Sequence, residues 1–262
     1  MKSLIYLILI SILMTNCSSE SNDNENSNSF LINLTPSATS VVVDQAFTIT
    51  VSATEEIKEL WVSTDNFATG GYAQRQFGTS YILNFNFDTL GQKTISVRAK
   101  NQNNVVSEKQ VVILVSRGNA IKIIGVQVIS FYGINTTYDP EYGATDPNRL
   151  ADLRFGLSKN KLGNPLDNIY SPAYWYLSSV IENQGNMTWD CSNDNLYLNP
   201  NAPLKFGLVD IDNGIAGADL LNGPPDYREI SFTNYLITKP TTITYTFPEI
   251  NLEFKVLVEW AN

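Results

Sequence analysis

Short runs of alternating apolar and polar residues most constrain what this chain can fold into. In 47–51, 81–87 and 95–99, apolar side chains fall on every second residue, as on one face of a β-strand. Turn-forming glycines such as Gly70 and Gly91 separate these runs, and long amphipathic helices are not apparent. The pattern predicts an all-β chain made of antiparallel β-sandwiches.

The length of the chain favours more than one domain. Without its leader, the chain of 262 residues fits two modest domains better than one core. A polar, glycine-containing break at 117–119 precedes a new apolar run at 121–131, whose phase shift near Gly125 predicts a β-bulge. We therefore expect two β-sandwich domains in tandem, at 30–116 and 120–262.

The chain opens with a charged start and a short apolar run. Lys2 precedes the apolar residues 4–14, a stretch typical of a secretory signal and too short to span a bilayer as a mature helix. An uncleaved membrane anchor and an ordinary signal cut elsewhere are the alternatives. The residues Met14-Thr15-Asn16-Cys17 resemble the lipobox of bacterial lipoproteins, although Asn16 stands where most lipoboxes have a small residue.

The resemblance to lipoproteins has further implications for the first residues. It implies a signal peptide at 1–16 and an acylated Cys17 as the mature N-terminus. Lipoboxes that tolerate a residue such as Asn16 before the cysteine resemble those of the Bacteroidota. The acidic, serine-rich residues 18–25 resemble the export tag that sends Bacteroidota lipoproteins to the outer face of the outer membrane. We expect 17–29 to be a disordered polar tether, with membrane contact through the lipid anchor.

Composition excludes several classes of function. The formal net charge is -9 without a basic cluster, which argues against a nucleic-acid partner. The chain has no histidine, so triads that depend on His are excluded, while carboxylate chemistry is not. Cys191 has no basic neighbour in the sequence and is predicted to be a small buried residue. No catalytic motif is found, and we do not expect an enzyme.

The first predicted domain resembles a known kind of spacer. The stretch Gly91–Asn101 resembles the penultimate strand of bacterial immunoglobulin-like and PKD-like domains, in which a glycine turn leads to an alternating strand. The resemblance covers 30–116 and implies a spacer or adhesive role. Trp61 is predicted to lie in the core of this domain rather than to form a ligand platform.

Two loops of the second predicted domain are rich in aspartate. Leu204–Asp212 predicts a strand that ends in Asp-x-Asp, and a long loop at 135–152 precedes another strand at 153–157. The candidate metal ligands are Asp139, Asp146, Asp152, Asp210, Asp212 and Asp219. A simpler alternative is a tight turn at Asn213 and Gly214, with the aspartates bonded to nearby backbone.

This aspartate pattern resembles the C2-type β-sandwich of calcium-dependent phospholipid-binding proteins. In that family the two loops lie at one end of the sandwich and share calcium ions, although here the gap between Asp212 and Asp219 is one residue longer. Calcium takes six to eight oxygen ligands, which clustered carboxylates supply. The resemblance covers 120–262 and implies a C2-like sandwich and calcium as the cofactor.

Other patterns in the second domain concern its strands. Residues 182–186 are predicted to form a hairpin between flanking strands. In the run Tyr174-Trp175-Tyr176, alternation predicts both tyrosines on one face and the tryptophan on the other.

Together these patterns predict a lipoprotein anchored in the bacterial outer membrane and facing the exterior. We expect a binding or adhesion protein for an extracellular glycan or protein, with calcium ordering the Asp loops. Two alternatives stay open. One is a glycan-active enzyme that pairs Asp210 with Asp152 or Glu182; the other is a structural component of a surface complex.

Overall fold

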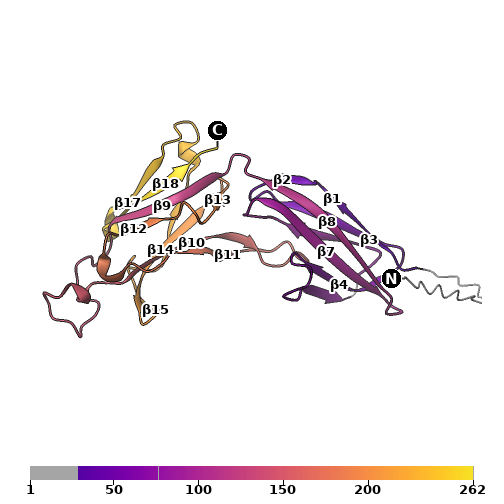
Figure 1. The fold of residues 1–262 in the computed structure, drawn as a ribbon, viewed down its shortest axis with the longest axis horizontal. Coiled ribbons are helices and arrows are strands. Elements are labelled where there is room, and N and C mark those ends of the chain that lie inside the picture. Colours follow the sequence, from indigo (N-terminus) through magenta and orange to yellow (C-terminus); the bar gives the residue numbers. More distant parts are fainter. Residues whose placement is uncertain (1–28, 76, 262) are drawn as a thin grey trace, which may run out of the picture.

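The structure, a computed structural model, describes residues 29–75 and 77–261. Its strands form two sets of sheets that follow one another along the chain (Figure 1). The predicted signal peptide at 1–16, Cys17 and nearly all of the predicted tether lie outside the described residues. Across the described part of the chain, no helix has the length and apolar character needed to cross a membrane.

Strands β1 to β8 form the first set of sheets, which we call the N-terminal sandwich. Its strands are β1 (Ile32–Pro36), β2 (Ser40–Val42), β3 (Phe47–Ala53), β4 (Ile57–Ser63), β5 (Tyr72–Arg75), β6 (Ser80–Phe85), β7 (Gly91–Asn101) and β8 (Val106–Ser116). One sheet has the order β1-β3-β6 and the other β2-β8-β7-β4-β5. The pairing is antiparallel except between β2 and β8, which run parallel.

The core of the N-terminal sandwich follows the alternation of the sequence. Ile49, Leu83 and Val97 are completely buried between its sheets, and β7 includes the predicted strand at 95–99 and extends beyond it at both ends. The prediction for Trp61 was wrong. Its neighbours Leu60 and Val62 point into the core, so Trp61 lies half-buried on the other face of β4, where the Lys100 ammonium is 5.2 Å from its ring centroid.

Strands β9 to β18 form the second set, which we call the C-terminal sandwich. Its strands are β9 (Ile121–Ser130), β10 (Leu153–Leu162), β11 (Tyr170–Leu177), β12 (Thr188–Asp190), β13 (Leu196–Leu198), β14 (Leu204–Asp212), β15 (Ile215–Asp219), β16 (Arg228–Ile230), β17 (Thr242–Phe247) and β18 (Leu252–Glu259). One sheet has the order β11-β10-β14-β15, with β16 also paired to β14. The other has the order β12-β9-β18-β17, with β13 also paired to β9.

Aromatic side chains join the two sheets of the C-terminal sandwich. Phe206 of β14 stacks on Phe254 of β18 with ring centroids 4.0 Å apart, and Trp189 meets Phe155 edge-on at 5.0 Å. Cys191 is buried beside this core, as predicted. The predicted bulge near Gly125 is confirmed, because the register between β9 and β18 shifts there. Every described sheet is mainly antiparallel, so the all-β class is confirmed.

Two local predictions in the C-terminal sandwich were wrong. Residues 182–186 are not a hairpin: the 3-10 turn Glu182–Gln184 carries the chain from one sheet to the other, where β12 pairs with β9. The alternation of Tyr174-Trp175-Tyr176 also fails. A register shift against β10 leaves Trp175 unpaired, so Trp175 and Tyr176 both pack against the core while Tyr174 points outward.

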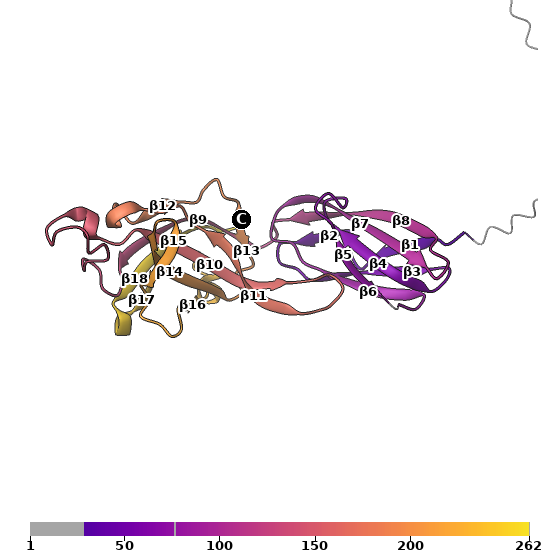
Figure 2. The ribbon, with the colours of Figure 1, turned by 90° about the horizontal axis from the view of Figure 1, so that it is seen from below.

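The β10–β11 hairpin extends from the C-terminal sandwich to the N-terminal one (Figure 2). Its tip places Leu166 in the apolar cluster of the N-terminal sandwich, with 4% of its surface exposed. The backbone N–H of Asn84 donates to the Pro165 carbonyl over 2.8 Å, and the Tyr81 hydroxyl donates to the Leu166 carbonyl. The hairpin is therefore packed into both sandwiches.

A buried ion pair lies in the same contact between the sandwiches. The Lys159 ammonium is 2.7 Å from Asp44 Oδ1, and Lys159 is 5% exposed. The other oxygen of Asp44 accepts from the backbone N–H of Asn199 over 3.0 Å. The Lys159 ammonium also lies 4.3 Å from the ring centroid of Trp175. These contacts hold the two sandwiches in one arrangement.

Candidate functional site

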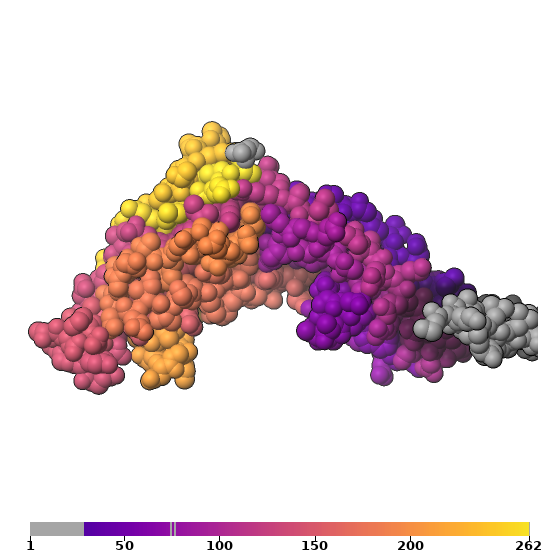
Figure 3. All heavy atoms as spheres, in the orientation of Figure 1, coloured from indigo at the N-terminus to yellow at the C-terminus, as the bar shows by residue number. Residues whose placement is uncertain are grey.

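A groove of about 440 Å³ lies on the outer face of the sheet β11-β10-β14-β15. This volume is within the usual range for small-ligand sites. Figure 1 shows this sheet as the lower layer of the C-terminal sandwich, and Figure 3 shows the β14–β15 hairpin as an orange projection below it. The groove is the strongest candidate for a binding site in the described part of the chain.

Two glycines form the floor of the groove. Gly156 of β10 pairs directly with Gly207 of β14, and both side chains would point to the outer face because Phe155 and Phe206 point into the core. Neither glycine has a Cβ, so neighbouring groups lie close over the middle of the sheet: a Cβ at Gly207 would be 3.5 Å from the carbonyl oxygen of Asp226. A Cβ at Gly156 would lie 3.2 Å from a methyl carbon of Leu177 and 3.5 Å from the ring of Tyr174. Gly156 thus lets these two side chains lie close to the sheet.

Tyr174 forms one wall of the groove. The side chain is 73% exposed although part of its ring packs against the backbone at Gly156. The register shift between β10 and β11 gives it this direction, because strict alternation would have placed it with Tyr176, which packs against the core. A supported ring with large exposed area is suited to stacking on an apolar ligand face.

The opposite wall is a fixed loop at 220–227. The Asp219 carboxylate accepts from the backbone N–H groups of Leu221, over 3.0 Å, and Gly223, over 2.5 Å. The Arg228 guanidinium donates to three backbone carbonyls around the loop, including that of Leu221 at 3.0 Å. This wall is held in place before any ligand arrives, which lowers the entropic cost of binding.

Two basic side chains also border the groove. Arg154 lies on β10 two residues before Gly156, and Lys205 lies on β14 two residues before Gly207. The Lys205 ammonium is 3.9 Å from the ring centroid of Tyr227, a cation–π contact. The groove thus combines a glycine floor, an exposed aromatic ring and two basic groups with the acidic residues Asp219 and Asp226.

The six predicted metal ligands are at different places in the C-terminal sandwich. Asp152 and Asp210 are neighbours, because β10 begins beside the end of β14: the backbone N–H of Asp152 donates to Asp210 Oδ1 over 2.7 Å. The Asp152 carboxylate itself accepts from the backbone N–H of Asn183 over 2.8 Å. Both carboxylates therefore also hold the backbone in place.

Asp139 and Asp212 share the electrostatic environment of this pair. Burial raises the pKa of Asp210, which is 2% exposed, and the charges of Asp212 and Asp139 raise it further. The pKa of Asp139 is raised by desolvation and by the charges of Glu141, Asp152 and Asp212. Such mutual repulsion is what close carboxylates without a cation produce. These four aspartates lie at one end of the sandwich.

The other two predicted ligands have local structural roles. Asp146 caps the 3-10 turn Pro147–Arg149 by accepting from the backbone N–H of Asn148 over 2.9 Å. Asp219 of β15 pairs with Val209 of β14, and its carboxylate caps the loop of the groove wall. In residues 29–75 and 77–261, no three acidic or cysteine side chains are placed to hold a metal ion.

The chain after Asp212 forms a tight turn. Asn213 and Gly214 have φ values of 50° and 81° and connect β14 directly to β15. Asn-Gly is the preferred pair for such a two-residue turn because both positions need positive φ. The simpler of the two sequence-based interpretations therefore describes this turn. It also explains why Asp219 lies along a returning strand rather than beside Asp212.

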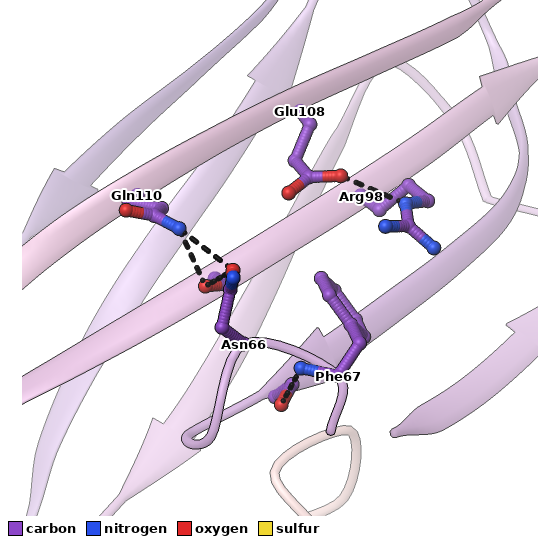
Figure 4. Close-up of polar contacts among 7 residues, drawn as sticks. Asn66, Phe67, Arg98, Glu108 and Gln110 are labelled. Atoms are coloured by element: carbon purple, nitrogen blue, oxygen red, sulfur yellow. Dashed lines mark hydrogen bonds and ion pairs between the residues drawn. The ribbon is translucent and has the colours of Figure 1, made fainter. Parts of the chain in front are cut away.

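The N-terminal sandwich has a second cavity, of about 330 Å³, beside the loop between β4 and β5. The carboxylate in this cavity, that of Asp65, already accepts hydrogen bonds from Ser63 and Thr69. These hydrogen bonds lower the pKa of Asp65 to about 2. Figure 4 shows the same loop held to the sheet, with Asn66 Oδ1 accepting from Gln110 over 2.8 Å. This cavity offers a ligand few free polar groups.

The enzyme alternative gains no support from these cavities. Neither the groove nor the cavity beside Asp65 is lined by Asp152, Asp210 or Glu182. Asp152 and Asp210 each accept a backbone N–H, and the backbone N–H of Asp152 lies between them. They do not face one another across an open space.

Sequence reasoning missed the groove. The signal was available in part, because Gly156 and Gly207 each interrupt an alternating strand, and a glycine inside a strand often marks a close approach of backbone or ligand. The pairing of these two glycines is visible only once the register of β10 and β14 is known.

No protein-family model matches the chain, and no curated protein is similar to it. Among solved structures, a PKD domain of an M14-like peptidase from Thermoplasmatales archaeon SCGC AB-540-F20 is 14% identical, with a TM-score of 0.28, and covers 34% of this chain and 96% of that chain. Fibronectin(III)-like modules of Clostridium thermocellum CbhA are 8% identical, with a TM-score of 0.26, and cover 76% of this chain and 93% of that one.

A third similar structure is a carbohydrate-binding module of the β-sandwich superfamily. It is 6% identical, with a TM-score of 0.27, and covers 89% of this chain and 98% of that chain. Because all three scores are low, the fold class rests on the strand pairing of the chain itself.

Proposed function

We propose that this chain is a carbohydrate-binding lipoprotein of the bacterial outer membrane, with its sandwiches facing the exterior. The observation that carries the binding role is the groove, where an exposed Tyr174 lies beside a floor formed by Gly156 and Gly207. Sugar rings have one flat apolar face and a rim of hydroxyls, so they fit an aromatic wall with polar groups nearby. The leader and Cys17 supply the anchor.

Glycan-array binding by the full chain in detergent tests the binding role. For a glycan that binds, Tyr174→Ala should weaken affinity about tenfold, which corresponds to about 1.4 kcal/mol. The matched control is Tyr72→Ala in the N-terminal sandwich, where the tyrosine is 43% exposed and outside the groove. Equal losses in both variants, or no glycan bound at all, would contradict the proposal.

The anchor and the location have their own experiment. Metabolic labelling with a clickable fatty acid should mark the wild-type chain and leave Cys17→Ser unlabelled. Protease added to intact cells should digest the wild-type chain if it faces the exterior. Protection of a labelled chain on intact cells would contradict the exterior location and leave the anchor in place.

We propose calcium binding at the four-aspartate end as a second property, with the C2-like resemblance as its origin. The supporting observation is that the charges of neighbouring aspartates add to burial, the largest cause of the raised pKa of Asp139 and of Asp210. No three of the described acidic side chains are placed to hold a metal ion as they stand, so binding requires the loops to move closer together. A cation would remove this repulsion and draw the loops together. At a concentration 100 times its Kd, a ligand that binds only the folded state adds about 2.7 kcal/mol to the free energy of unfolding.

Thermal unfolding in calcium and in chelator tests the site. Calcium should raise the Tm of the wild type by about 5 °C or more at that saturation, and Asp210→Asn/Asp212→Asn should abolish the rise. In chelator, Asp212→Asn alone should melt no lower than the wild type, because it removes a repulsive charge. The remote variant Glu56→Gln serves as the control, and identical wild-type melting curves in calcium and chelator exclude the site.

A further inference from the structure

Arg154 borders the groove with a guanidinium that the described protein does not satisfy. Its Nε is buried and has no hydrogen-bond partner. None of the ion pairs found among residues 29–75 and 77–261 includes Arg154. A buried donor without a partner is costly, and an ionised one more so. Arg154 as a whole is only half-buried, so a ligand oxygen can reach the rest of its guanidinium, in surroundings less hydrated than those of a fully exposed arginine.

The neighbours of Arg154 explain why it stays unpaired. On β14 it faces Val209, an apolar residue, and on the next strand Val209 faces Asp219. The Asp219 carboxylate is directed to the backbone N–H groups of Leu221 and Gly223 rather than to Arg154. The second basic group of the groove, Lys205, is over the ring of Tyr227. Asp226 also lines the groove, but none of the ion pairs found in the described residues joins it to Arg154, so Arg154 is available to an external anion.

We propose that the groove takes a carbohydrate whose sugars carry carboxylates, such as a uronic-acid polymer, and that Arg154 receives one carboxylate. This inference rests on the proposed function and names the substrate class of the same site. A guanidinium matches a carboxylate with two parallel hydrogen bonds, which a hydroxyl cannot offer. Tyr174 then stacks on a sugar ring over the glycine floor.

An acidic peptide fits the groove less well. An extended peptide gains most of its affinity by pairing its main chain with a free strand edge. The floor of the groove is the face of β10 and β14, and β10 is paired on both sides, so its backbone groups are already used. What the floor offers is a flat surface with an aromatic wall, which suits a ring rather than an extended backbone.

The acidity of the whole protein does not exclude an anionic ligand. The net charge of -9 repels a polyanion at long range, but salt screens exposed charges beyond about 8 Å at physiological ionic strength. The contact at Arg154 is short-ranged and partly desolvated, so it is screened much less. We therefore expect affinity for acidic sugars to persist in physiological salt.

The test compares oligogalacturonate with its fully methyl-esterified form, which keeps the sugar rings and removes the charge. Both are titrated into full-length protein in detergent by calorimetry. The wild type should bind the acidic form about tenfold more tightly or better. Arg154→Gln should remove this preference while keeping binding to the ester, and Arg154→Lys should restore only part of it because the fork geometry is lost.

Each outcome separates this inference from the proposed function. If the wild type binds both forms equally, or if Arg154→Gln keeps the preference, the role of Arg154 is overturned while Tyr174-dependent glycan binding stands. If neither form binds and no neutral glycan binds, both proposals fail. Tighter binding of an acidic peptide than of the oligogalacturonate also overturns the inference. Unfolding curves of both Arg154 variants show whether each is folded. Lys205→Gln also removes one positive charge from the groove but should keep the preference for the acidic form, because Lys205 lies over the ring of Tyr227.

Discussion

On the sheet β2-β8-β7-β4-β5 of the N-terminal sandwich, charged side chains pair with one another, whereas on the sheet β11-β10-β14-β15 of the C-terminal sandwich none of the described acidic side chains forms an ion pair with Arg154. Arg98 is 2.8 Å from Glu108, and Lys100 is 3.1 Å from Glu59. Both sandwiches have two sheets around an apolar core. Two sandwiches of the same architecture can therefore differ in whether a sheet face offers an unpaired charged group to a ligand.

The two cavities differ in the same way. In the N-terminal cavity, Asp65 and its neighbours satisfy one another within a single loop. In the groove, glycines form the floor, the wall is held by Asp219 and Arg228, and Arg154 has a buried Nε without a hydrogen-bond partner. This difference agrees with the proposal that the C-terminal sandwich contacts the ligand.

The largest expected effect comes from breaking the buried contact between the sandwiches. Lys159→Ala leaves the nearly buried Asp44 without its ammonium and should lower the free energy of unfolding by about 3 kcal/mol. We expect separate unfolding transitions for the two sandwiches in calorimetry. The control is Lys161→Ala, whose pair with Asp88 is exposed and worth less than about 1 kcal/mol. A single, unshifted transition in Lys159→Ala would show that the sandwiches do not depend on this pair.

A smaller effect on stability, but a clear one on binding, is expected from filling the glycine floor. Gly156→Leu places a side chain where Leu177 and Tyr174 now lie and should reduce glycan affinity about tenfold or more. Gly78→Leu in the N-terminal sandwich meets nothing within 4 Å and should leave affinity unchanged. Unaltered binding by a folded Gly156→Leu would mean that ligands do not use this floor.

The smallest expected effect concerns the N-terminal cavity and its dependence on pH. Hydrogen bonds from Ser63 and Thr69 lower the pKa of Asp65 from 3.8 to about 2. A lowered folded-state pKa adds stability above pH 3.8, and this contribution is lost as the pH falls towards 2. The Tm advantage of the wild type over Asp65→Asn should therefore be small near neutral pH and vanish around pH 2. An advantage independent of pH would contradict the assignment.

Local pattern predicted much of each sandwich. The predicted strand at 95–99 lies within β7, the predicted strand that ends at Asp212 is β14, and the bulge near Gly125 was visible as a shift in apolar phase. These features depend on neighbouring residues alone, because a strand with one buried face needs an apolar side chain at every second position.

Features that depend on a partner strand were mispredicted. The orientation of Tyr174 differs from the prediction because the register between β10 and β11 shifts and leaves Trp175 without a partner residue on β10. Residues 182–186 connect two sheets, since β12 finds its partner in β9 rather than in β11. Alternation within a strand cannot indicate which other strand will pair with it or where that pairing slips.

The sequence by itself determined the all-β class, most of the strands, the buried Cys191 and the grouping of acidic residues near the ends of β10 and β14. Tertiary structure alone decided that Gly156 meets Gly207, that Arg154 faces Val209 instead of an acid, and that the β10–β11 hairpin packs into both sandwiches. The physical reason is that strand propensity is local, whereas a site on a sheet face is assembled from residues that the register between strands brings together.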